Sequence, residues 1–141
     1  MSEMLTIAGS RVEADARSAS YRRLYATILV IQAIIAAVAF VYPEWACRLL
    51  GIPLAASAVP WPRLAATFLL ALVAFQVPGY LDPIYNRSLN VLGILSRCST
   101  ALVLVLLGGG FYWLAAFDLV CAILLFLSYQ SLIKAEVMTR P

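Results

Sequence analysis

The sequence predicts an all-α integral membrane protein, an antiparallel bundle of four spanning helices with a short interfacial helix after the first span. Two observations support this prediction. Hydrophobic residues make up 64% of the 141 residues and charged residues only 12%, whereas a soluble domain is about half apolar and about one-quarter charged. Most of the chain also divides into four apolar stretches of ~18–23 residues each, which matches a hydrocarbon core ~30 Å thick.

The first span, at about residues 24–42, follows a polar segment. We expect residues 1–23 to be a cytoplasmic N-terminal arm, with Ser18 or Ser20 capping the helix that enters the membrane. A cleaved signal peptide is the alternative, since arginines precede the apolar run. That run is longer than a typical signal-peptide core, and no clear small-residue cleavage site follows it, so we expect an uncleaved span.

A short helix is expected in residues 43–53, lying on the outer surface of the membrane. Pro43 suits the first position of such a helix. Trp45 within it, Trp61 before the second span and Trp113 in the fourth span would lie at the headgroup level, where tryptophan is enriched.

The remaining spans are joined by short connections. Pro78 and Gly79 could kink or end the second span near its exit. The second span covers about residues 64–81, the third about 89–107 and the fourth about 111–133, and residues 134–141 form a cytoplasmic tail.

The positive charges favour an orientation with both chain ends in the cytoplasm, because Lys and Arg concentrate in cytoplasmic flanks. Only Arg48 and Arg63 flank the opposite side. The side that holds both termini has seven cations: Arg11, Arg17, Arg22, Arg23, Arg87, Lys134 and Arg140.

The composition excludes several kinds of chemistry. The chain has no histidine, so it offers no ordinary haem ligand, no usual zinc site and no histidine general base. Its three cysteines, Cys47, Cys98 and Cys121, lie far apart and form no CxxC pair. The net charge of +3 is modest, and no basic patch indicates nucleic-acid binding. We therefore expect no metal, no catalytic residue and no bound cofactor, with a quinone or a lipid left open.

Four polar side chains form the candidate site. Arg97 lies about eight residues into the third span and Asp118 about seven into the fourth, ~12 Å and ~10 Å from opposite membrane edges at ~1.5 Å per residue. A charge at mid-membrane costs at least ~2.5–3.5 kcal/mol, so both should face the bundle interior and find partners. With Arg63 above Asp118 and Gln76 below Arg97, we predict a polar ladder through the bundle.

This ladder has three interpretations. It could only lock the register of the helices, which is the interpretation we prefer. It could bind an anionic or quinone-like headgroup, or contact another subunit. A proton path is the weakest alternative, because a single buried carboxylate has no chain of acids or histidines to continue it.

The overall plan resembles the DoxX-like group of small four-helix bacterial membrane proteins. The resemblance implies a membrane-embedded subunit, associated in some relatives with quinone-linked oxidation, and it carries over no catalytic residue. The matching features are the size, the short outer helix, Asp82-Pro83 and Arg87 in the inner link, Ser96-Arg97 in the third span and Asp118 in the fourth.

We therefore expect a non-catalytic accessory or structural subunit of a larger complex in the bacterial inner membrane, in an electron-transfer or respiratory assembly. Its partners would be other membrane protein subunits and lipids. One alternative is a quinone-interacting oxidoreductase subunit that uses a pocket around Arg97 and Asp118. The other is a binder or carrier of small lipophilic molecules. Both alternatives predict an open cavity near Arg97, whereas an accessory subunit predicts a filled bundle.

Overall fold

The computed structural model describes residues 2–52 and 58–138, with side chains from Arg11 onward. Arg140, which contributed to the predicted orientation, lies outside these residues. Within the described part of the chain the structure is helical, with no strand. The helices are α1 (Ser2–Val41), α2 (Pro43–Leu49), α3 (Pro60–Leu81), α4 (Arg87–Leu107) and α5 (Phe111–Met138).

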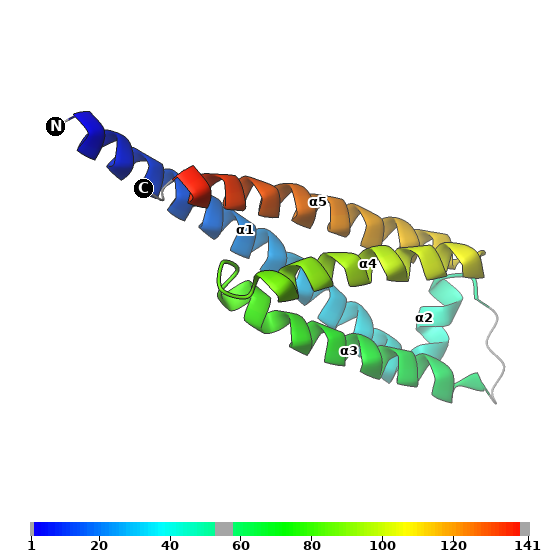
Figure 1. The fold of residues 1–141 in the computed structure, drawn as a ribbon. Helices are drawn as coiled ribbons and strands as arrows, with labels where there is room; N and C mark the ends of the chain where they lie inside the picture. The colour runs from blue at the N-terminus through cyan, green and yellow to red at the C-terminus, as the bar shows by residue number, and fades with distance from the viewer. Residues whose placement is uncertain (1, 53–57, 139–141) are drawn as a thin grey trace.

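The four long helices run antiparallel along one another (Figure 1). Both termini lie at one end of the bundle and α2 lies at the other. Helix α1 packs against α3 and α5, and α5 also packs against α4, whereas α3 and α4 touch each other less. Each long helix has a segment long and apolar enough to cross a membrane. The protein is therefore an all-α, multi-pass membrane protein, as predicted.

The polar N-terminal segment differs from the prediction. Helix α1 begins at Ser2 and continues without a break to Val41, so the expectation that Ser18 or Ser20 caps a new helix is wrong. A formed helix extends at little cost where no proline interrupts it. Figure 1 shows the N-terminal part of α1 and the C-terminal part of α5 running side by side beyond the link between α3 and α4.

The contact between these extensions involves few residues. Ala14 and Tyr21 of α1 are buried. The guanidinium of Arg17 donates a hydrogen bond of 2.6 Å to Ser131 Oγ on α5. This part of the arm therefore packs against α5 of the same chain.

The end of the bundle opposite the termini is built around the short helix α2. Pro43 occupies its first turn, and Pro43 and Cys47 are buried. Gly51 after it has a φ of 67°, a left-handed conformation that suits glycine. A Cβ on Gly110 would overlap the backbone carbonyl of Leu50. The turn before α5 therefore presses directly on the segment that follows α2, and a side chain would prevent this contact.

Pro78 does not end the second span at its own position, because it lies inside α3. The helix ends three residues later at Leu81. The interior of the bundle is small, and many large apolar side chains point outward, as lipid contact requires. The main buried cluster comprises Tyr21, Tyr25, Ile28, Leu29, Cys121, Leu125, Tyr129 and Leu132.

Candidate functional site

Four buried side chains, one from each long helix, form what we term the polar centre: Gln32, Gln76, Arg97 and Asp118. Arg97 is 1% exposed. Its Nη2 donates hydrogen bonds to Gln32 Oε1 at 2.7 Å and to Gln76 Oε1 at 3.2 Å. Its Nη1 lies 3.5 Å from Asp118 Oδ1, within ion-pair distance. One guanidinium thus connects α4 to the three other long helices.

Asp118 has two partners in the polar centre. In addition to Arg97, the Nε2 of Gln32 donates to Asp118 Oδ1 at 3.5 Å. Gln32 therefore accepts a bond from the cation and donates one to the anion. An isolated buried charge is very costly, whereas a pair with further hydrogen bonds recovers part of the cost. The pair carries no net charge, and this neutrality permits its burial among the helices.

The helical repeat explains how these side chains come to face inward. On α4, Asn90, Gly93, Arg97 and Ala101 are buried at spacings of three or four residues, which places them on one face. Helix α1 likewise has one buried face, with residues at spacings of three or four: Tyr21, Tyr25, Ile28, Gln32 and Ala36. Gln32 lies on this buried stripe. The predicted ladder omitted Gln32, although its position on this stripe was a signal that could have identified it.

A second polar layer lies about two to three helical turns from the polar centre, toward the chain ends. Tyr21 Oη donates to Asn90 Oδ1 at 2.9 Å, and Asn90 Nδ2 donates to the carbonyl of Pro83 at 3.0 Å. Tyr25 Oη donates to Gln76 Oε1 at 3.4 Å. These bonds tie α1 to α3, to α4 and to the link between them.

Two glycines allow this layer to form. A Cβ on Gly79 would lie 2.8 Å from Asn90 Oδ1, and a Cβ on Gly93 would lie 3.1 Å from Tyr25 Oη. Glycine at these positions lets polar side chains from neighbouring helices occupy the space that a methyl group would fill. Gly79, considered in the sequence only as a helix breaker, is a packing residue.

Arg63 is not part of the polar centre. The structure brings the other three ladder residues together, but Arg63 is exposed. Arg63 lines a cavity of about 310 Å³ beside α2, at the end of the bundle opposite the termini. No hydrogen bond or ion pair involves its side chain in the described part of the chain. The physical reason is its position in the first turn of α3, where a long cation reaches the headgroup region more cheaply than the bundle interior.

The three tryptophans lie in α2 and at the starts of α3 and α5, at the end of the bundle opposite the termini. Trp45, Trp61 and Trp113 are 56%, 70% and 79% exposed. Exposed indole rings at one end of a membrane bundle are typical of anchors in the interface.

Two nitrogen atoms in the polar centre have no hydrogen-bond acceptor among the described residues, Arg97 Nε and Gln76 Nε2. Neither of two cavities among the described residues, of about 450 and 310 Å³, is lined by a residue of the polar centre. No group of three or more cysteine, aspartate or glutamate residues that could hold a metal lies together in the same part.

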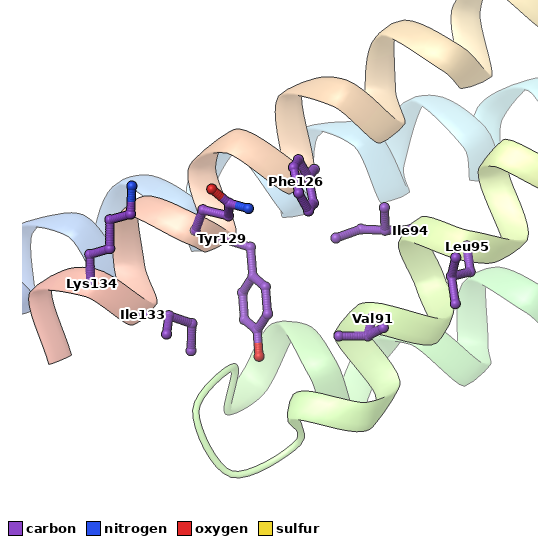
Figure 2. Close-up of a pocket in the computed structure, with 8 residues that line it drawn as sticks. Val91, Ile94, Leu95, Phe126, Tyr129, Ile133 and Lys134 are labelled. Carbon is purple, nitrogen blue, oxygen red and sulfur yellow. The ribbon is translucent and has the colours of Figure 1, made fainter. Parts of the chain in front are cut away.

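A larger cavity, which we term the Tyr129 groove, lies between α4 and α5 (Figure 2). Its volume is about 450 Å³. The ring of Tyr129 extends from α5 toward α4 in this space. Tyr129 Oη is buried without a hydrogen-bond partner among the described residues. The sequence analysis did not single out this residue. The groove is lined by Val91, Ile94, Leu95, Phe126, Tyr129, Gln130, Ile133 and Lys134.

Comparison with known proteins identifies no relative. The chain matches no protein-family model, and no curated protein or solved structure is significantly similar to it.

Proposed function

We propose that this protein is a non-catalytic accessory or structural subunit of a larger membrane complex. The observation that supports this proposal best is that the polar centre bonds all four long helices together. Ionisable groups inside a membrane usually mark a transport path or a ligand site. Here Arg97 and Asp118 are bonded to each other and to amide groups of α1 and α3. Their polar capacity is used mainly to join helices.

The same observation disfavours the two alternatives in the form that the sequence suggested. A quinone site or a lipophile carrier built on Arg97 needs space beside the guanidinium. Neither of the two best-defined cavities of the described residues is lined by Arg97 or Asp118. A filled interior instead favours a protein whose outer surface contacts other chains.

Two surfaces are suited to such contacts. Within the membrane, α4 and α5 present large exposed apolar side chains, among them Leu102, Leu106 and Leu127. Beyond the link between α3 and α4, the N-terminal part of α1, which pairs with the end of α5, carries exposed charged residues, including Arg11, Glu13 and Arg17. We propose that the first surface packs against partner helices and that the second contacts a partner outside the bilayer.

The proposal further assigns the protein to the bacterial inner membrane, with both termini in the cytoplasm. The excess of cations at the end that holds the termini supports this orientation. An electron-transfer or respiratory assembly is proposed from the resemblance to the DoxX-like group, which is an argument from fold-level analogy.

The decisive experiment is the isolation of the tagged protein from its own membranes in a mild detergent, followed by native mass spectrometry. We expect at least one further membrane protein at fixed stoichiometry. An Arg97→Leu variant should lose this companion together with the stability of the bundle. A monomer or homodimer without companion, or substrate turnover by the isolated chain, would contradict the proposal.

The orientation has its own test, in a chain whose native cysteines are replaced. Tyr85 and Trp113 are exposed at opposite ends of the bundle. An impermeant thiol reagent added to spheroplasts should label Trp113→Cys, and it should label Tyr85→Cys only after the membrane is opened. Equal labelling of both variants in closed cells would refute a fourfold crossing, and the inverse pattern would reverse the orientation.

A further inference from the structure

The Tyr129 groove carries an inference that goes beyond a role in assembly. Its walls are apolar side chains of α4 and α5, and its volume of about 450 Å³ lies in the usual ~300–1,000 Å³ range of ligand pockets. The groove is not lined by any residue of the polar centre, and it is partly open between two helices that each have a membrane-spanning segment. An acyl chain is the occupant that such walls favour.

The phenol of Tyr129 adds a polar requirement. Tyr129 is only 7% exposed, and its Oη has no hydrogen-bond partner among the described residues. Burial of an unpaired hydroxyl is costly, so buried tyrosines normally have a partner. Tyr21, whose ring lies 5.6 Å from that of Tyr129, is bonded to Asn90. The Tyr129 hydroxyl is covered by protein atoms and has no acceptor there, so a small rotation of its ring, which lines the groove, would bring an unpaired donor to an occupant.

Two positively charged side chains near the groove, Lys134 and Arg87, form no ion pair with a described residue. Lys134 lines the groove. Arg87 lies about one helical turn before Val91, which lines the groove, and among the described residues its guanidinium is bonded to the backbone carbonyl of Ile84, through Nε. The nearest acidic residues in sequence are Asp82, which accepts a bond from the backbone of Tyr85, and Glu136, which has an interaction of its own.

We propose that the Tyr129 groove binds one anionic phospholipid. Its acyl chain lies against the apolar walls, its phosphate is held by Lys134 and Arg87, and the Tyr129 hydroxyl donates to a phosphate or ester oxygen. Basic pockets between membrane helices on the cytoplasmic side are typical sites for anionic headgroups. A neutral quinone would use the hydroxyl but not the two cations. The charges therefore favour the phospholipid over a quinone.

The test is native mass spectrometry of the full-length protein after exchange into defined lipid, with phosphatidylglycerol and phosphatidylcholine compared. We expect one retained phosphatidylglycerol and at least tenfold weaker retention of phosphatidylcholine. Tyr129→Phe should reduce phosphatidylglycerol retention roughly fivefold, the value of one hydrogen bond. Lys134→Gln should reduce it by about tenfold or more, since this bond involves a charged group.

Two matched controls accompany these variants. Tyr85→Phe removes an equally polar hydroxyl from an exposed tyrosine near the same end of the bundle, and Arg48→Gln removes a cation at the opposite end. Both should retain phosphatidylglycerol like the unmodified protein. Equal retention of the two lipids, or unchanged retention in both Tyr129→Phe and Lys134→Gln, would overturn the proposal. Retention of an added quinone that depends on Tyr129 but not on Lys134 would also overturn it, in favour of a quinone site. None of these outcomes depends on whether a protein companion is found.

Discussion

The polar centre and the Tyr129 groove place polar side chains in the same apolar bundle in opposite ways. In the polar centre, Arg97 has acceptors on three other helices. In the groove, the hydroxyl of Tyr129 has none among the described residues. A polar group that bridges helices stabilises their arrangement, whereas an unbonded one costs free energy unless a ligand pairs with it. The first site therefore suits a structural role and the second suits binding.

Removal of the cation should have the largest effect. Arg97→Leu leaves Asp118 buried without its counter-ion, which should cost about 3–5 kcal/mol of the free energy of unfolding. Thermal unfolding in detergent, followed by circular dichroism, measures this loss. The double variant Arg97→Leu with Asp118→Asn should recover much of it, because no uncompensated charge remains. If single and double variants were equally unstable, the ion pair would not be the main contribution of the polar centre.

The bridging amide comes next. Gln32→Leu removes the acceptor of the 2.7 Å bond from Arg97 and the donor to Asp118. Hydrogen bonds to charged groups contribute about 1.5–3 kcal/mol, so we expect a loss in that range in the same unfolding assay. Ile31→Leu, at an exposed neighbouring position on α1, serves as the control and should be neutral. A neutral Gln32→Leu would show that Arg97 and Asp118 pair sufficiently without a bridge.

Most of the fold could be predicted from the sequence, because length and hydropathy determine which segments can cross lipid. The four spans, the short helix led by Pro43 and the inward position of Arg97 all follow from local pattern. Helical depth also placed Arg97 near Asp118. Position along a helix, however, does not show how easily an arginine in the first turn of a helix extends to the membrane interface. For this reason Arg63 was predicted too close to Asp118.

The features that the sequence did not predict depend on contacts between helices. The helical arm is joined to α5 by the hydrogen bond between Arg17 and Ser131, two residues far apart in the chain. Gln32 joins the polar centre because α1 turns the same face to three neighbours. The Tyr129 groove exists because the side chains of α4 and α5 leave space on one side. The contact of the arm and the groove each depend on two helices, so no local pattern predicts them. For Gln32 the helical spacing of α1 predicts an inward side chain, but not its partners on the other helices.

The close contact at Gly79 provides a third test. It concerns the second polar layer, beside the link between α3 and α4. In an unobstructed helix Gly→Ala is stabilising by up to ~1 kcal/mol. Here the added methyl would lie 2.8 Å from Asn90 Oδ1, so we expect Gly79→Ala to destabilise by about 1–3 kcal/mol through overpacking. The penalty should shrink or reverse in an Asn90→Ala background, as a double-mutant cycle would measure. An additive cycle would mean that the two residues do not compete for space.

The smallest expected effect separates the two sites most directly, by removing one hydroxyl from each of two neighbouring tyrosines whose rings are tilted by 42° to one another. Tyr21→Phe loses the 2.9 Å bond to Asn90 and should cost about 0.6–1 kcal/mol. In delipidated protein Tyr129→Phe loses no bond and should change stability by less than about 0.5 kcal/mol, or slightly increase it. Added phosphatidylglycerol should stabilise the Tyr21→Phe variant as much as the unmodified protein, and the Tyr129→Phe variant less. Equal costs for the two substitutions without lipid would show that the Tyr129 hydroxyl already has a partner, and the distinction between the two sites would then fail.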